Sequence, residues 1–402
     1  NHVFNNKLFG NATLYLSNYN FGVGYQENNT TFRGGELIRT TDQDVGFQSD
    51  VKDKGVRMDF DYIPSPDHYI RFGLNATNHY FIPGVSRFQE TDTANEFERD
   101  TVLNSSPINS WEYFGYFEDD FKLGQRLKLN LGVHASAFSL RDKTYFSIQP
   151  RLSARFLVGN HWSLKGAFST MAQPLHLLVN SGLGLPTDLW ISPTSKLKPQ
   201  RSWQAAIGAA TSIGKGIEIS LEGYYKDMTN LVAYREGSSF FLTNNNIEDR
   251  VTQGVGRAYG GELFIQKKTG KTTGWIGYTL AWSDRQFDLL NNGERFPFKY
   301  DRRHDFTIAI VHQASKKIRL SGTWVYTTGN AINIPIREYD INTPFNDDFL
   351  FPIAADSGER NSFRVRPYHR LDLSVGYYKK KRWGEQSFNF GVYNFYNRRN
   401  PF

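Results

Sequence analysis

The sequence predicts an all-β protein, an antiparallel β-barrel that spans a membrane. Three observations predict it: apolar and polar residues alternate in many segments, these segments run to about a dozen residues, and the connections between them alternate between short and long. Ordinary strands average about five to six residues, whereas tilted strands of about 9–11 residues cross a bilayer. Length and alternation together favour a membrane barrel over a soluble β-sandwich.

The alternation is clearest in residues 126–138, where apolar side chains fill every second position from Leu127 to Ala137. The intervening positions, Arg126 to Ser136, are mostly polar, as in a strand with one apolar and one polar face. The same pattern predicts sixteen strands, at 7–17, 20–27, 54–62, 69–80, 111–122, 126–138, 146–158, 162–170, 202–213, 217–228, 255–267, 273–283, 302–312, 318–328, 368–378 and 386–396.

The predicted connections fall into two classes. Short turns are expected at Asn18–Tyr19, 64–68, 124–125, 159–160, 214–216, 269–271, 315–317 and 379–385, and long segments at 28–53, 81–110, 171–201, 229–254, 284–301 and 329–367, with a medium loop at 139–145. Outer-membrane barrels have this layout, with tight periplasmic turns and long extracellular loops. Sixteen such strands would begin and end on the long-loop side, so we expect residues 1–402 to form a single, partial barrel domain with further strands outside it.

Composition excludes several classes of protein. With no Cys there is no disulfide framework, thiolate metal site or Cys nucleophile. The chain lacks any run of 18 apolar residues, so no transmembrane helix is expected. A net charge of +7 from scattered Lys and Arg is too mild to indicate nucleic acid. The 62 aromatic residues (32 Phe, 22 Tyr and 8 Trp) cluster toward the strand ends, as expected of girdles at the two membrane surfaces.

Several motifs carry a family resemblance. They are Ile148 to Phe156 (IQPRLSARF), Leu197 to Ser202 (LKPQRS, with Gln200 where Glu is usual), Gly256 to Leu263 (GRAYGGEL), Gly274 to Thr279 (GWIGYT), Tyr300 to Phe306 (YDRRHDF) and Asn389 to Pro401 (NFGVYNFYNRRNP). In this order, they resemble the C-terminal part of TonB-dependent outer-membrane receptors of the kind abundant in Bacteroidota. Residues 1–144 match mainly by pattern.

The resemblance implies a 22-stranded barrel of which about 16 strands are present, with an N-terminal plug and a TonB box outside this sequence. It also implies an outer-membrane transporter that binds a scarce nutrient at its extracellular loops and imports it with energy from TonB. Siderophore, cobalamin, glycan and peptide ligands all remain open. Outer-membrane lipids and a surface lipoprotein are further expected partners, and no cofactor is implied.

Binding residues concentrate in long loops, and aromatic and Arg side chains are common anchors. The ligand-binding candidates are Phe81, Arg87, Phe88, Trp190, Arg337 and Tyr339, although packing of the loops on themselves is an equal alternative. The segment 171–201 is unusually apolar for an exposed loop, so we expect it to fold back onto the plug or to carry a short helix. Charged residues predicted to face the lumen are Arg57, Asp59, Asp61, Arg71, Glu218, Glu222, Arg319, Arg370 and Asp372.

Catalytic and metal sites are not expected. His304 lies beside Asp301 and Asp305, but at a strand start this grouping favours structural hydrogen bonding over a metal site or general base. Asn244–Asn246 and Asn346–Asp348 could offer oxygen ligands to Ca²⁺, but solvated loop tips are the better interpretation. We therefore predict a non-enzymatic outer-membrane transporter. The alternatives are a passive porin-like channel, often with a loop folded into the lumen, and a soluble all-β glycan-binding or hydrolytic protein.

Overall fold

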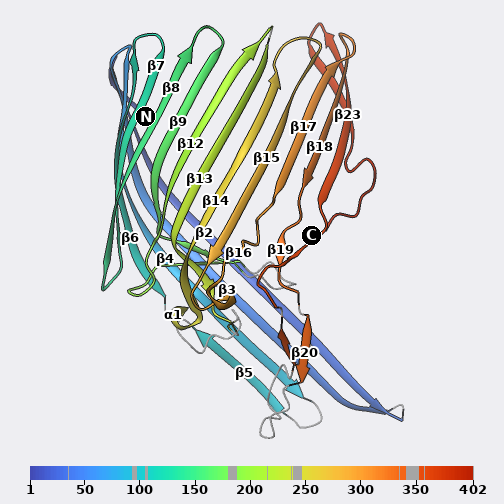
Figure 1. Cartoon of the computed structure of the whole chain (residues 1–402). Helices are drawn as coiled ribbons and strands as arrows, with labels where there is room; N and C mark the ends of the chain where they lie inside the picture. The colour runs from blue at the N-terminus through green and yellow to red at the C-terminus, as the bar shows by residue number, and fades with distance from the viewer. Residues whose placement is uncertain are drawn as a thin grey trace.

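The computed structural model (Figure 1) describes residues 1–34, 36–92, 97–104, 107–179, 188–214, 216–236, 238, 247–334, 336–340, 353–356 and 358–401. Most of these residues form β-strands. The described helices are α1 (Ile247–Arg250) and the 3-10 turn η1 (Asn291–Gly293). None of the described helices has the length and apolar character needed to cross a membrane.

The strands form one large antiparallel sheet in which each long strand pairs with the next along the chain. In spatial order these strands are β1 (His2–Asn5), β2 (Leu8–Arg33), β3 (Glu36–Ser65), β4 (His68–Asp92), β6 (Ile108–Leu123), β7 (Leu127–Ser139), β8 (Thr144–Val158), β9 (Trp162–Gln173), β12 (Gln200–Ile213), β13 (Ile217–Tyr234), β14 (Val251–Lys267), β15 (Thr272–Gln286), β17 (His304–Gln313), β18 (Ile318–Thr327), β23 (Tyr368–Lys381) and β24 (Gly384–Val392). The predicted all-β antiparallel fold is confirmed.

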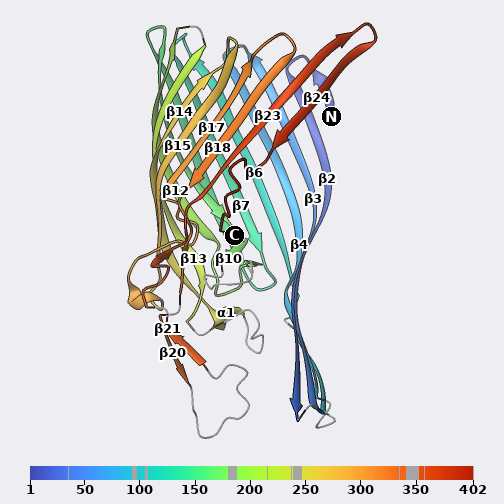
Figure 2. The same ribbon diagram turned by 90° about the vertical axis from the view of Figure 1, so that its right-hand side faces the viewer.

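Shorter strands lie in the long connections. β5 (Phe97–Asn104) and β16 (Phe296–Pro297) extend the main sheet, whereas three pairs stand apart from it: β10 (His176–Leu178) with β11 (Leu189–Ile191), β19 (Ala331–Ile332) with β22 (Phe363–Arg364), and β20 (Arg337–Asp340) with β21 (Ile353–Asp356). Most short turns lie at one end of the curved sheet. The long connections lie at the other end, together with the short turns between β2 and β3 and between β7 and β8 (Figures 1 and 2). We call the long-loop end the mouth.

The sheet curves around a central space but has two free edges within the described residues. β24 pairs only with β23, and β1 pairs with β2 only between His2↔Gly10 and Asn5↔Leu8. Most of one edge of β2 is therefore unpaired. Figure 2 shows β24 and β2 on the two sides of this opening.

The prediction for the first two strands was wrong. Residues 7–17 and 20–27 belong to one strand, β2, with no turn at Asn18–Tyr19. The polar run there interrupts the apolar alternation, but its backbone stays in register with β3, where Asn18 pairs with Lys52 and Asn20 with Asp50. The turn comes instead beside Gly34, whose φ of +63° is in the left-handed region that glycine tolerates. Within the described residues the main sheet contains 18 strands rather than the sixteen predicted, because two predicted strands merge into β2 while β1, β5 and β16 were not predicted.

Two predicted long loops are largely strand. Residues 28–53 and 81–110 mostly continue β2, β3 and β4 and add β5, forming a ribbon that projects past the rest of the mouth (Figure 1). Cross-strand amide–carboxylate bonds run along the ribbon, from Gln26 to Asp44 at 2.9 Å and from Asn28 to Asp42 at 2.5 Å. These polar pairs stabilise strands that the apolar pattern could not reveal. The last strand also ends earlier than predicted, at Val392.

The two faces of the wall differ as the alternation predicted. Large apolar side chains are exposed on the outer face, including Leu14, Leu74, Ile148 and Ile207. The charged residues expected to face the lumen alternate with them. On β3, for example, Arg57 and Asp59 share the face of Phe47, which points into the barrel, while Met58 is exposed on the other side.

Aromatic side chains form a belt on the outer face near the mouth. Ring contacts join successive strands from β9 to β15: Phe168–Trp203 at 6.3 Å, Trp203–Tyr225 at 5.4 Å, Tyr225–Tyr259 at 6.2 Å and Tyr259–Trp282 at 5.3 Å between centroids. Rings with an apolar body and a polar edge suit the membrane–water boundary. The belt thus marks the membrane surface on the side of the mouth, as expected from the aromatic residues at the strand ends.

Candidate functional site

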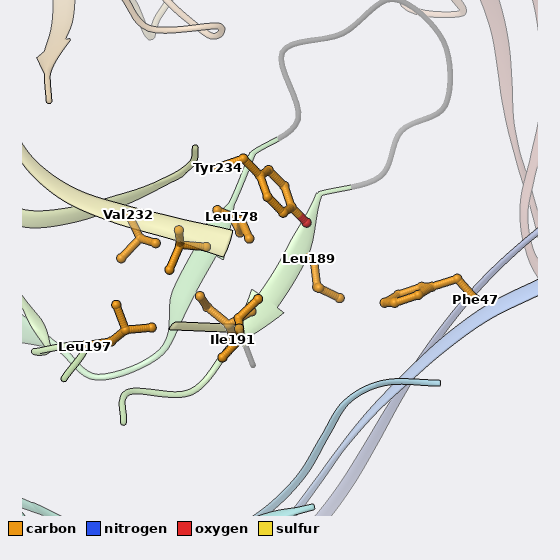
Figure 3. Close-up of a cluster of buried hydrophobic side chains, with 9 residues drawn as sticks. Phe47, Leu178, Leu189, Ile191, Leu197, Val232 and Tyr234 are labelled. Carbon is orange, nitrogen blue, oxygen red and sulfur yellow. The ribbon is translucent and has the colours of Figure 1, made fainter. Parts of the chain in front are cut away.

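The segment between β9 and β12 folds into the mouth. Its hairpin β10–β11 contributes Leu178, Leu189 and Ile191 to a buried apolar cluster that also contains Phe47 of β3 (Figure 3). In the sheet, β4, β6, β7 and β8 lie between β3 and β9, and β12 follows β9. The hairpin therefore reaches across the lumen to a distant part of the wall.

The cluster is closed from the other side by the ends of β13 and β14. Val232 and Tyr234 of β13, Ile247 of α1 and Val251 of β14 pack in it together with Leu197. Leu178 and Ile191 are fully buried, each 0% exposed. Burying one such side chain contributes about 1.5–3 kcal/mol. The apolar residues that made segment 171–201 unusual thus hold it inside the barrel, and the described part forms a hairpin rather than the short helix that was one alternative.

A second apolar cluster lies beside this core, at the end of β13 and in the connection that follows β15. It contains Leu231, Ala233, Phe287, Leu290 and Phe296. Together the two clusters and the hairpin β10–β11 form what we call the mouth layer.

Polar contacts tie the hairpin to the surrounding loops. Asp188, just before β11, accepts a hydrogen bond from the Tyr300 hydroxyl at 2.5 Å and lies 3.7 Å from the Lys299 ammonium group. Burial, and then the bond to Asp188, raise the pKa of Tyr300 to about 12. On the other side, the Tyr145 hydroxyl donates to the Thr194 carbonyl at 2.7 Å. The mouth layer is thus anchored at both ends of the segment.

His176 is a neutral histidine inside the mouth layer. It is fully buried, and its Nδ1 accepts a hydrogen bond from the Gln200 side chain at 3.0 Å. Its Nε2 has no hydrogen-bond partner within the described ranges. Burial lowers the pKa of His176 to about 4, because a charged imidazolium would be desolvated there.

Arginines and aromatic rings gather beside the mouth layer. The Arg285 guanidinium stacks 3.5 Å from the Phe298 ring centroid, and Arg303 lies 4.7 Å from that of Trp282. Asp301 is only 2% exposed and binds both Arg303, at 3.2 Å, and Arg364. It also accepts from the Ser283 amide at 2.7 Å. These contacts of Asp301 fix the connection between β15 and β17, which carries Tyr300.

Ion pairs line the lumen wall between the mouth layer and the short-turn end of the barrel. Arg57 contacts Asp59 at 2.9 Å, Arg71 contacts Glu118 at 2.7 Å and Arg370 contacts Asp372 at 2.9 Å. A hollow of 410 Å³ at the wall is lined by Asp120, Lys128, Arg155, Lys165 and Glu222, among others. This wall is polar, as in barrels that hold water or a plug.

A family comparison assigns this architecture. The model of the family described as "TonB dependent receptor-like, beta-barrel" matches residues 1–395. The chain belongs to this family. It is an outer-membrane β-barrel, and the resemblance found in the motifs is confirmed.

Solved TonB-dependent receptors have the same fold at low sequence identity. A copper transporter, OprC, matches with a TM-score of 0.62 and 13% identity over 99% of this chain and 58% of its own. P. aeruginosa FpvA, solved with iron-bound pyoverdine, matches with a TM-score of 0.60 and 12% identity over 99% of this chain and 51% of its own. The FrpB iron transporter of Neisseria meningitidis matches with a TM-score of 0.58 and 11% identity, over 95% and 58% respectively.

The chain thus spans little more than half the length of these receptors. No curated protein matches the sequence.

The sequence-predicted ligand residues of this family member do not form one site. Phe81 lies in β4 rather than in a loop and is 1% exposed. Arg87, also in β4, is exposed and pairs with Asp100 of β5 at 2.7 Å. Trp190 lies in β11 within the mouth layer, and Arg337 is exposed in β20. Phe88 and Tyr339 belong to β4 and β20 by backbone, but their side chains lie outside the described residues.

The other candidates separate as well. His304 lies 2.9 Å from the Tyr278 hydroxyl through its Nδ1, whereas Asp301 binds Arg303 and Arg364. Within the described ranges, no group of three or more His, Asp or Glu side chains is arranged to hold a metal ion. Asn244–Asn246 and Asn346–Asp348 lie outside the described residues.

Sequence reasoning missed Asp188, Arg285, Phe298 and Tyr300 as mouth residues. Tyr300 was part of a family motif, which could have drawn attention to it, but its partner Asp188 is far away in the sequence.

Proposed function

We propose that the chain is the barrel part of an active outer-membrane transporter, which binds a scarce nutrient at its mouth and imports it with energy from TonB. Family membership supports this proposal, and so do the relatives of the same fold described as iron and copper transporters.

The mouth layer is the observation that carries the proposal. Side chains from the hairpin β10–β11, β3 and β13 pack together across the lumen. A large solute that takes this route would have to displace them, because Leu178 and Ile191 are fully buried. Import then needs a conformational change, for which a transporter requires binding energy or an external source of work.

The ligand would first contact side chains on the outer surface of the mouth. We propose Arg87, Trp190 and Arg337 from the sequence candidates, with Tyr300 added by the structure; the guanidinium of Arg285 is largely buried and would be reached only after the mouth opens. Phe81, Phe88 and Tyr339 remain sequence candidates, of which Phe81 would become accessible only if its surroundings opened. Stacked aromatic and cationic groups such as Phe298 and Arg285 suit ligands with planar or anionic parts.

We also propose that residues 1–402 form one partial barrel domain, completed by strands and a plug from outside this sequence. In lipid, unpaired backbone groups cost several kcal/mol each, so an open strand edge cannot face the hydrocarbon. The free edges of β2 and β24 would pair with those strands. TonB would act on the plug rather than on this chain.

A passive channel is the second candidate. The inward fold of the segment between β9 and β12 favours it, because porin-like channels often carry such a loop. A soluble glycan-binding protein is disfavoured by the wide exposed apolar face of the wall.

Growth of a deletion strain tests the proposal. We expect the strain to lose growth on one limiting nutrient among iron–siderophore complexes, cobalamin, glycans and peptides, and to regain it with the intact gene. Growth should be lost equally when TonB is depleted. Uptake that persists without TonB and rises in proportion to nutrient concentration would instead establish the passive channel.

A further inference from the structure

The outer face of the wall carries an apolar groove across β3, β4, β6, β7 and β8. It has a volume of 610 Å³ and an almost entirely apolar lining. Ligand pockets typically span about 300–1,000 Å³. The groove faces away from the lumen, so neither the mouth layer nor the lumen wall explains it.

The register shows how the groove is built. Two neighbouring rows of paired residues cross the five strands on the outer face. The first row is Met58, Leu74, Gly115, Ala135 and Ile148, and the second is Val56, Ala76, Tyr113, Ala137 and Phe146. Gly115 and Ala135 lie in the middle of the first row. In the second row Ala76 and Ala137 lie on either side of Tyr113, and large or branched side chains stand at the ends of both rows. The gap between them is a furrow open to the hydrocarbon.

The next rows toward the mouth have a different chemistry. Lys54, Asn78 and Trp111 lie in register just beyond the second row, and Lys52 and Tyr80 lie one row further. Successive rows on one face are roughly 7 Å apart. Trp111 stacks on Tyr113 with the ring centroids 5.8 Å apart, as expected where the hydrocarbon gives way to headgroups.

The two lysines are exposed and have no ion-pair partner within the described ranges. The nearest carboxylate further along the outer face of β3, Asp50, already accepts a hydrogen bond from Asn20. Two free ammonium groups therefore stand at headgroup level, directly beyond an apolar furrow. An occupant that complements both features needs an anionic head and an apolar chain.

We propose that this groove binds a lipid of the outer leaflet, with an acyl chain in the furrow and a phosphate of its headgroup on Lys52 and Lys54. The acyl chain replaces contacts that Leu or Phe side chains would make elsewhere on the wall. The phosphate pairs with two lysines that form no ion pair within the described residues. The site is independent of nutrient import, and it takes a structural ligand rather than the transported one.

Native mass spectrometry of the intact protein in a mild detergent tests the proposal, with diphosphorylated lipid A and phosphatidylcholine as probes. We expect lipid A adducts to dominate for the wild type, even with excess inorganic phosphate. Lys52→Gln with Lys54→Gln should weaken binding about fivefold per lysine. Ala135→Leu with Ala137→Leu should remove the adduct by filling the furrow.

Ala209→Leu is the matched control, because Ala209 lies on the outer face of β12, in register with Leu221, away from the groove. It should bind lipid A like the wild type. Resistance of each variant to SDS at room temperature shows that its barrel is folded. Equal binding of both probes by the wild type, or full lipid A binding by the filled variant, would overturn the proposal. So would loss of a co-purifying protein, rather than lipid, from the filled variant.

Discussion

The barrel wall and the mouth layer place apolar residues in opposite ways. In the wall, Ile148 and Ile207 are 75% and 74% exposed, and the polar side chains face inward. In the mouth layer, Leu178 and Ile191 are fully buried, as in a soluble core. The wall relies on lipid and on its hydrogen-bonded ladder, while the layer relies on packing. One chain therefore contains two stability regimes, and substitutions should distinguish them.

The largest effect is expected from Leu178→Ala combined with Ile191→Ala. Each substitution should cost the mouth layer about 2–5 kcal/mol, because it leaves a cavity in a closed core. Hydrogen exchange in residues 174–179 and 188–199 should accelerate, and conductance in planar bilayers should rise. Ile148→Ala with Leu221→Ala, on the outer face, is the control. It should leave both the hydrogen exchange of these residues and the conductance unchanged. Equal effects of the two pairs would remove the distinction between the regions.

Acidification should weaken the mouth layer alone. His176 has a pKa of about 4 in the folded layer against 6.5 ordinarily, so the unfolded state binds more protons between these values. Stability is then complete above about pH 6.5 and falls as the pH decreases toward 4, by about 3 kcal/mol in total. Hydrogen exchange of the hairpin across this range measures the loss. His176→Asn should flatten the profile, and an unchanged slope in that variant would assign the effect to another group.

A charge on the outer face probes the wall. Ile207→Arg should cost about 2–4 kcal/mol if the residue lies near the middle of the bilayer. Gln204→Arg, on the lumen face of the same strand, should change stability little. Unfolding of the protein from lipid vesicles by guanidinium chloride compares the two variants. A similar cost at both positions would contradict the assignment of the faces.

The smallest effect is expected from Tyr300→Phe. The substitution removes the hydrogen bond to Asp188 but keeps the ring and the nearby Lys299. Because Tyr300 is partly exposed, the loss should be about 1 kcal/mol. Hydrogen exchange of the backbone amides of β11 should accelerate modestly, while that of β3 should stay unchanged. Complete opening of the hairpin would show that this bond, rather than apolar packing, closes the mouth.

The wall could be predicted from sequence because its alternation is local. Leu127 to Ala137 specify a strand and its apolar face without reference to any other segment. The polar ribbon of β2 and β3 was missed because its stabilising pairs, such as Asn28 with Asp42, contain no apolar signal.

The mouth layer was only partly predictable. The apolar residues of segment 171–201 indicated that it folds back, but its contact with Phe47 joins residues far apart in the chain. The anchor between Asp188 and Tyr300 depends in the same way on how the sheet curves, which no local pattern encodes.

The ribbon that includes β2 and β3 projects far beyond the bilayer. The 26 residues of β2 extend to roughly 85 Å at strand spacing, whereas the apolar band of a barrel is about 25 Å tall. Even with tilt, about half of the ribbon stands clear of the bilayer. A bulky particle that approaches from the side of this ribbon would meet the ribbon before it reached the mouth.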